Sequence, residues 1–494
     1  MPFNPPHVEL AGIAPELALS IAALVLLVLD AVLGERLRGR HLPILTTVGF
    51  GIAIGFAIAG WRSEAEIQLS GMVANDGFAA FVKVTLCTFG LLSVWLAREY
   101  LQREKIEEPE FYALVMFAVA GMMLMAAATD LIVMFLALET FSLALYVLVG
   151  FRRRALASQE SAMKYFLLGS FSSAFFLLGI ALAYGATGST SFYGNGDAEG
   201  LATFLAATPV GGVGLLVLAT GLLTIGLGFK VAAVPFHMWT PDAYQGAPSP
   251  VTGFMAAASK LAGFAALLRL LDATLFSLRS DWRPLVIAIA VATMIVGSVV
   301  AVVQEDLKRL LAYSSIAHAG FVLTGVIATS DRGVSGALFY LATYGLTVLG
   351  AFAVVAVLAG RDEKRVRLVD FRGLFYDHPM LAAALTLFLL SLAGVPITSG
   401  FVAKLVVFGA AIETGYAWLA VIGVLTSAIA AFFYLRVMVV MYMQERQGAA
   451  PETQLGPLAT GVVAITAIAT IVFGLFWGPL IELAEQATFV AVPP

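Results

Sequence analysis

Apolar residues occur in long continuous runs that are separated by short polar segments. A helix that crosses a bilayer needs about 20 mainly apolar residues, whereas a membrane β-strand alternates apolar and polar residues over about ten. The continuous runs therefore predict helices. Fourteen such runs lie near residues 10–33, 42–61, 77–97, 111–128, 130–150, 160–184, 209–230, 250–272, 284–303, 309–328, 334–359, 380–412, 417–443 and 457–484.

The composition agrees with a membrane protein. Hydrophobic residues make up 60% of the 494 residues and charged residues only 12%. A soluble domain carries roughly 25% charged residues, so an ordinary soluble enzyme and a disordered chain are both excluded. A net charge of −4 gives no basic field for nucleic acid. One cysteine, Cys87, excludes a disulfide framework and cysteine-ligated zinc or iron–sulfur sites. We predict an all-α, multi-pass membrane protein, with residues 1–494 forming one membrane domain.

Loop lysines and arginines predict the orientation, because cytoplasmic loops carry an excess of them. Alternate loops, starting with the one after the first run, contain Arg36, Arg38, Arg40, Arg98, Arg103, Lys105, Arg152, Arg153, Arg154, Lys308, Arg309, Arg361, Lys364, Arg365, Arg367, Arg372 and Arg446. The other loops contain Arg62, Arg279, Arg283 and Arg332. We expect the first group to face the cytoplasm of a bacterium, with both termini on the periplasmic side of its cytoplasmic (inner) membrane.

An internal repeat is visible when the chain is aligned with itself. At an offset of 175 residues the segment 146–150 falls on 321–325, and at an offset of 174 Lys230 falls on Lys404. The predicted repeats are 111–272 and 284–443, preceded by three helices in 1–110 and followed by one in 457–484. Five helices per repeat is an odd number, so the second copy crosses the membrane in the opposite sense. Inverted repeats are typical of transporters, whose sites lie near the midplane on interrupted helices.

Two runs contain a proline close to a lysine. Lys230 is followed by Pro235, and Pro396 precedes Lys404. Proline removes a backbone donor and disrupts a helix, and irregular backbone is tolerated at this depth only beside protein or water. A simple proline kink is the alternative. Corresponding positions and a neighbouring lysine in both cases favour true interruptions.

Charged residues inside the runs are the candidate functional groups. A charge at the bilayer centre costs roughly 2.5–3.5 kcal/mol on insertion scales, so it is expected to be paired, hydrated or functional. Long side chains near span ends can reach the surface, which is our expectation for Lys83, Arg269 and Arg436. Asp30 and Asp76 are likewise expected at the surface. The remaining charges are Glu139, Lys164, Lys230, Lys260 and Lys404.

These residue types favour proton relay over bond-making chemistry. Burial disfavours a charged lysine and a nearby carboxylate favours it, so a lysine whose partner moves can exchange a proton. Glu139, which shares a helical stripe with Ser142 and Tyr146, would hold the proton on Lys230 when the two are close. A static ion pair of Glu139 with Lys230 or Lys164 is the structural alternative, and Lys164 could also extend to the cytoplasmic surface.

Two histidines and a tyrosine could bridge the gaps between the lysines. Histidine titrates at about pH 6.5, so His237 and His318 could pass protons through water. His318 lies on a stripe with Ser314. Structurally, His318 could instead be a hydrogen-bonded core residue, His237 could cap backbone carbonyls at the helix break, and Tyr434 could be ordinary core packing.

The segment 236–252, FHMWTPDAYQGAPSPVT, resembles the signature of the antiporter-like subunits of proton-pumping NADH:quinone oxidoreductase, respiratory complex I. The resemblance extends over nearly the whole chain. Three paralogous subunits share this fold, and the segments 138–143, 160–174 and 433–437 resemble one of them. Lys404 stands where a second paralogue carries glutamate, and the long lateral helix of the third is absent.

The resemblance implies a proton-translocating subunit that is driven by quinone reduction elsewhere in the complex. Its partners would be the other complex I membrane subunits, including the paralogues, and the lipid bilayer. FMN, iron–sulfur clusters and quinone are expected on other subunits, and no cofactor is expected on this chain. Matching relay positions are Glu139, Lys164, Lys230, His237, Lys260, Lys404 and Tyr434. The alternatives are a subunit of a multi-subunit cation/proton antiporter or membrane-bound hydrogenase, and a passive structural spacer.

Overall fold

A computed structural model describes residues 9–34, 41–194, 199–208, 214–446 and 456–490. The loop residues Arg36, Arg38 and Arg40 and the start of the predicted run at 209 lie outside these ranges. Among the described residues, twelve helices are long and apolar enough to cross a membrane. Two shorter apolar helices, α8 and α16, lie in the runs that were expected to be interrupted. Together they account for the fourteen predicted runs.

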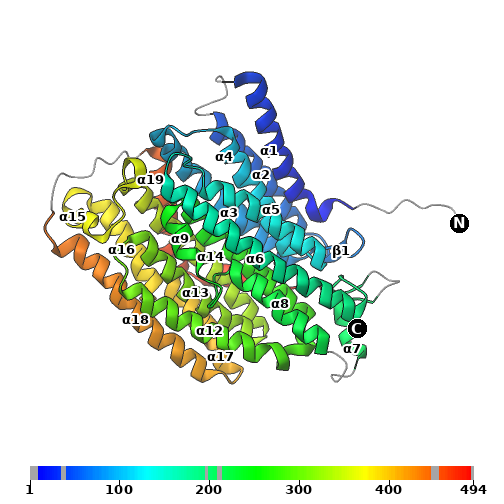
Figure 1. Ribbon diagram of the computed structural model, residues 1–494. Coiled ribbons are helices and arrows are strands. Elements are labelled where there is room, and N and C mark those ends of the chain that lie inside the picture. The colour runs from blue at the N-terminus through cyan, green and yellow to red at the C-terminus, as the bar shows by residue number, and fades with distance from the viewer. Residues whose placement is uncertain (1–8, 35–40, 195–198, 209–213, 447–455, 491–494) are drawn as a thin grey trace.

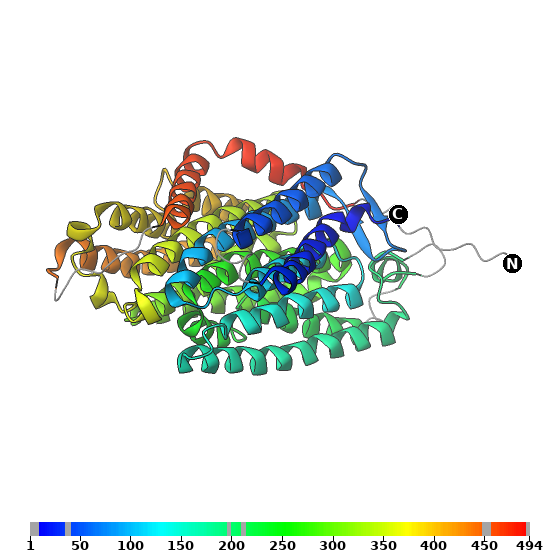
Figure 2. The same ribbon diagram turned by 90° about the horizontal axis from the view of Figure 1, so that it is seen from above.

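The helices lie side by side in one bundle (Figure 1). Figure 2 shows α19 and α20 along one edge and α6 along the opposite edge. The elements are η1 (Ala11–Ile13), α1 (Ala14–Leu33), α2 (His41–Trp61), β1 (Glu66–Gln68), β2 (Val73–Asn75), α3 (Gly77–Glu104), α4 (Pro109–Ala127), α5 (Leu131–Val149), α6 (Leu156–Thr187), α7 (Leu201–Ala207), α8 (Gly214–Lys230), α9 (Trp239–Gly246), α10 (Ser249–Phe254), η4 (Met255–Ser259), α11 (Lys260–Leu268), η5 (Arg269–Thr274), η6 (Phe276–Leu278), α12 (Arg279–Val302), α13 (Leu307–Ala328), α14 (Asp331–Leu358), η7 (Arg361–Glu363), η8 (Leu368–Phe371), α15 (Leu374–Asp377), α16 (Pro379–Ala393), α17 (Ser399–Glu413), α18 (Ala417–Met443), α19 (Pro457–Leu475) and α20 (Gly478–Gln486).

Both predicted interruptions are confirmed. The helix α8 ends at Lys230, and irregular backbone leads to α9; α16 ends at Ala393, and α17 begins at Ser399. The freed backbone groups find partners, as burial requires: the amide of Val234 donates to Oγ1 of Thr293 at 2.9 Å. The breaks lie on opposite sides of the two lysines, because Lys230 precedes its break and Lys404 follows its own.

Packing follows the same order in both halves. In the first, α4 packs on α5 and α6 on α8; in the second, α12 packs on α13 and α14 on α16 and α17. Two repeats would produce this order. The segment Ser249–Thr274, α13 and α14 are almost wholly buried and form the centre of the bundle.

Some local structure differs from the predicted helices. The expected continuous helix at 457–484 is wrong: α20 starts afresh with Pro479 in its first turn, because proline clashes with the preceding turn. The segment Ser249–Thr274 contains two π-helical stretches, η4 and η5, which hydrophobic periodicity does not reveal. The short antiparallel strands β1 and β2 and the helix α7 were not predicted.

Four of the expected surface charges do not reach the surface: Arg269, Asp76, Lys83 and Arg436. Arg269 does not reach the surface but is buried, and its guanidinium donates two hydrogen bonds of 2.9 Å to Asp76, which is also buried. Lys83 is buried, with its ammonium 2.9 Å from Oε1 of Glu16. Each cation finds its carboxylate on a different helix or loop, so these pairs lock distant parts of the bundle together. Asp30 is half-buried.

Arg436 is half-buried and extends sideways within the bundle. Its guanidinium donates to the carbonyl of Val302 at 2.7 Å and to that of Gln304. These carbonyls lie at the end of α12, where a helix leaves carbonyls without intrahelical partners. Arg436 therefore caps α12 rather than reaching solvent.

We expect Asp76→Asn to destabilise the protein, because Arg269 would stay buried without its carboxylate. Breaking a buried ion pair by removing one partner costs about 3–5 kcal/mol. Thermal unfolding of the purified protein should show a lower midpoint, while Asp281→Asn, at an exposed site, should not change it. Equal midpoints for both variants would show that the Arg269–Asp76 pair does not hold the fold.

Candidate functional site

Lys230 lies at the C-terminal end of α8 and is buried. Its ammonium donates a hydrogen bond of 2.6 Å to Oγ of Ser142 on α5. Four aromatic rings surround it, with centroids between 5.4 and 5.6 Å from Nζ, and cations are attracted to such ring faces. These rings belong to Phe141, Tyr146, Tyr165 and Phe229. The predicted stripe on α5 thus presents a hydroxyl and an aromatic ring to this lysine.

Glu139 lies one turn before Ser142 on α5 and is half-buried. It accepts a hydrogen bond from the hydroxyl of Ser173 on α6. Within the described part of the chain, no ion pair joins Glu139 to Lys230 or to Lys164, so the static-pair interpretation is wrong. Glu139 lies one turn along α5 from Ser142, the residue that accepts the hydrogen bond of Lys230.

Lys260 begins α11 directly after the π-helical stretch η4. Its buried ammonium donates to the backbone carbonyl of Ser315 on α13. One turn further, Gly263 packs on α8, where a Cβ on the glycine would lie 3.5 Å from Cβ of Lys230. The two lysines therefore lie on adjacent helices, about one turn apart.

His318, Tyr340 and Tyr434 form a buried cluster near the second repeat's break. Nδ1 of His318 is 2.7 Å from the hydroxyl of Tyr340, and Nε2 is 3.3 Å from that of Tyr434. The Tyr434 hydroxyl also bonds to Ser314. Tyr434 is thus more than core packing, and it joins the two stripe residues Ser314 and His318. Sequence reasoning missed Tyr340, because a tyrosine in an apolar helix carries no distinguishing pattern.

Lys404 lies in the second turn of α17 and folds back onto the end of α16. Its ammonium donates to the carbonyls of Leu392 at 3.1 Å and Ala393 at 2.9 Å, and lies 5.0 Å from the ring centroid of Phe321. The C-terminal end of a helix is the negative end of its dipole, so it suits a cation. Gly394 ends α16 at φ +88°, and a Cβ there would lie 3.2 Å from Nζ of Lys404. Glycine at this position leaves room for the ammonium.

A small cavity lies beside the histidine cluster, where α13, α14, α16 and α17 meet. Its volume is about 10 Å³, close to what one water molecule needs. His318, Tyr344 and Leu392 are among the lining residues. Since Leu392 also accepts from Lys404, the cavity lies where a water could connect His318 to that lysine.

Two buried hydroxyls near Lys260, those of Ser315 and Tyr244, have no hydrogen-bond partner among the described residues. Buried polar atoms are normally paired with protein or with ordered water. These hydroxyls are therefore candidate positions for water beside the central lysine.

Two predicted relay residues, Lys164 and His237, lie apart from the buried lysines. Lys164 is exposed on α6, with its ammonium 2.7 Å from Glu160 and 3.0 Å from Asp242, which also pairs with Arg309 at 2.7 Å. His237 is half-buried in the break, and its backbone carbonyl accepts from Thr240. Among the described residues, no hydrogen bond joins either side chain to the buried lysines.

The lysines Lys230, Lys260 and Lys404 share one property: in the described part of the chain, none of the three lies within ion-pair distance of a carboxylate. Lys230 has a hydroxyl and rings, Lys260 a carbonyl, and Lys404 carbonyls and a ring. Neutral partners stabilise an ammonium less strongly than a carboxylate does, so a proton can leave more easily. No group of three or more His, Cys, Asp or Glu side chains among the described residues could hold a metal ion.

Comparison with known proteins gives a consistent family. A family described as NADH:quinone oxidoreductase/Mrp antiporter, transmembrane, matches residues 128–430. NADH-quinone oxidoreductase subunit N of Trichlorobacter lovleyi is 41% identical over 97% of this chain and 97% of its own length. A chain of respiratory complex I from Thermus thermophilus with bound aureothin has a TM-score of 0.81 and 35% identity, covering 95% of this chain and 99% of that one. A chain of the Mrp complex from Dietzia has a TM-score of 0.84 at 22% identity, covers 96% of both chains, and shows the shared fold alone.

Proposed function

The chain belongs to the family of NADH-quinone oxidoreductase N subunits, the proton-translocating antiporter-like membrane subunits of respiratory complex I, and from this premise we propose the path by which it moves protons. The path leads from Glu139 through Lys230 and Lys260 to Lys404. The sequence resemblance to one of three complex I paralogues is confirmed by the relatives named subunit N.

The absence of a carboxylate beside the three lysines, within the described residues, carries this proposal. A lysine held only by neutral groups can lose its proton without leaving a buried anion behind. Glu139, held by Ser173 one turn away from the Lys230 site, would favour the protonated lysine when it approaches. Loosening that approach would push the proton toward Lys260.

The remaining residues supply the links between lysines. His318 and Tyr434 would carry the proton from Lys260 toward Lys404, with a water in the adjoining cavity. Lys164, in its exposed network with Asp242, would tune the first pair from the protein surface. His237 would contact water in the helix break.

We further propose that the subunit lies in the cytoplasmic membrane of a bacterium with both termini periplasmic. It would contact paralogous antiporter-like subunits, and quinone reduction in other subunits would drive proton translocation. FMN, iron–sulfur clusters and quinone would then be held by those subunits. Membership of the subunit N family decides against an independent antiporter or hydrogenase subunit, because the likeness to the Mrp chain concerns the fold alone.

Lys230→Ala should leave the complex assembled, because the variant leaves no unpaired buried charge. We expect coupled NADH:quinone turnover and proton translocation in proteoliposomes to fall by about 100-fold, the lower end of what a positioned proton-transfer group contributes. Lys364→Ala, at an exposed loop lysine, is the control and should behave as the unmodified complex. Unchanged proton stoichiometry in Lys230→Ala would contradict the relay, and normal pumping in Glu139→Gln and Lys404→Ala as well would support a passive spacer.

Tyr434→Phe keeps the ring but removes the hydroxyl that contacts Ser314 and His318. A hydrogen bond contributes about 1 kcal/mol, so we expect proton translocation to slow by about fivefold. Tyr442→Phe is a matched control on the same helix, since its hydroxyl accepts from Thr386 at 3.1 Å, away from the relay. If both variants pump equally fast, Tyr434 is not part of the path.

A further inference from the structure

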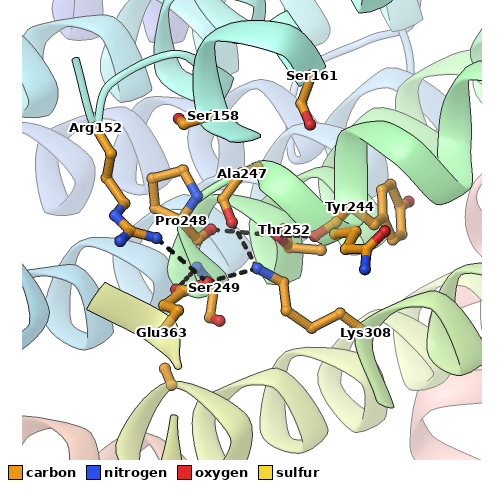
Figure 3. A network of polar contacts seen from close by, with 12 residues as sticks. Arg152, Ser158, Ser161, Tyr244, Ala247, Pro248, Ser249, Thr252, Lys308 and Glu363 are labelled. Atoms are coloured by element: carbon orange, nitrogen blue, oxygen red, sulfur yellow. Dashed lines mark hydrogen bonds and ion pairs between the residues drawn. The ribbon is translucent and has the colours of Figure 1, made fainter. Parts of the chain in front are cut away.

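A third buried ion pair lies at the turn between α9 and α10 (Figure 3). The ammonium of Lys308 is 2.7 Å from Oε2 of Glu363, and it also donates to the carbonyl of Ala247 at 2.6 Å. The amide of Ser249 donates to Oε1 of Glu363 at 2.6 Å. Both charged side chains are buried. Lys308 was predicted in a cytoplasmic loop, but it is buried in the first turn of α13.

The pair satisfies two helix ends at once. The carbonyl of Ala247 lies just beyond the end of α9, and the amide of Ser249 starts the segment Ser249–Thr274. Helix ends leave carbonyls and amides without intrahelical partners, with negative and positive partial charge respectively. A lysine at the carbonyl and a glutamate at the amide complement these charges, so the turn is held from both sides.

Glu363 joins three separate parts of the chain. Besides Lys308 and Ser249, it lies 3.9 Å from Nη1 of Arg152, which follows α5 (Figure 3). Burial alone would raise the pKa of Glu363, but Lys308, the Ser249 amide and Arg152 together hold that pKa below its ordinary value. Glu363 is therefore a fixed anion at the meeting point of α5, the α9–α10 turn and α13.

Lys308 and the Lys260 partner lie on the same face of α13. Ser315 follows Lys308 by seven residues, which is two helical turns or about 10 Å along the axis. The segment Ser249–Thr274 is thus attached to α13 at two points, at its start through Lys308 and Glu363, and further along through Lys260. The π-helical stretch Met255–Ser259 lies between the two attachments, and π-bulges are frequent at functional sites.

We propose that Lys308 and Glu363 are positioning residues of the proton relay, which hold the start of the segment Ser249–Thr274 against α13 so that the Lys260 ammonium stays at the Ser315 carbonyl. The inference rests on the proposed relay, because it assigns the pair a role only through Lys260. The pair itself carries no transferred proton. Its effect is geometric: if the turn shifts along α13, Lys260 loses its partner and its distance to both neighbouring relay sites changes.

The test uses the assembled complex in proteoliposomes. Glu363→Gln keeps the size of the side chain and removes its charge, and we expect coupled proton translocation to fall by about threefold or more. Lys308→Met should have the same effect, whereas Lys308→Arg keeps a cationic donor and should restore most of the activity. Glu305→Gln is the matched control, because Glu305 forms an exposed ion pair with Arg367 at 2.9 Å and should leave translocation unchanged.

A loss of assembly in the single variants is addressed by the double variant Lys308→Met/Glu363→Gln, since removing both partners of a buried pair is much less damaging than removing one. This double variant should assemble and still translocate slowly. In a Lys260→Arg background, Glu363→Gln should add little further loss, because residues that act through one another do not have additive effects.

The outcomes separate this inference from the relay itself. Slow translocation in Lys230→Ala together with normal translocation in Glu363→Gln and in the double variant would overturn the positioning role and leave the relay intact. Effects of Glu363→Gln and Lys260→Arg that simply multiply would also overturn it. Normal translocation in Lys230→Ala would instead reject the relay.

Discussion

The structure depends on keeping three lysine ammonium groups inside the bundle with neutral partners. Removing an ion from water costs several kcal/mol, so every available dipole near Lys230, Lys260 and Lys404 has to contribute. The helix breaks meet this need. An unbroken helix satisfies its carbonyls internally, whereas the end of α16 offers two to Lys404. Lys230 lies at the corresponding negative end of α8, inside a ring of aromatic side chains.

Other buried cations are paired with carboxylates. This difference distinguishes cations that stabilise the fold from the lysines proposed to transfer protons. Lys83, Arg269 and Lys308 each have a carboxylate at 2.7–2.9 Å, which fixes the charge and joins distant segments. Within the described residues, none of these three carboxylates forms an ion pair with Lys230, Lys260 or Lys404. Strong ion pairs therefore hold the fold rigid, whereas weaker contacts with neutral groups occur where a lysine has to gain and lose a proton.

The sequence alone predicts those features that follow from the cost of burying polar and charged groups. Long apolar runs predicted the helices, and prolines predicted both interruptions. Isolated charged residues within the runs singled out Glu139, Lys230, Lys260 and Lys404 as candidates. Contacts between distant segments were not predictable, because no local pattern reveals them. Arg269 is buried against Asp76 and Lys308 against Glu363, and in both pairs the partner lies far away in the sequence. The partners of Glu139 and Lys230 were also not predictable: Lys230 donates to Ser142 and Glu139 accepts from Ser173.

The central claim is that protons pass along the buried lysines through water held by neutral groups. The most direct test is a cryo-electron microscopy map of the assembled complex at a resolution that shows individual water molecules. We expect ordered water between Lys230 and Lys260, beside the unpaired hydroxyls near Lys260, and in the cavity beside His318. Continuous dry packing between these side chains in both the resting and the turning-over complex would contradict it.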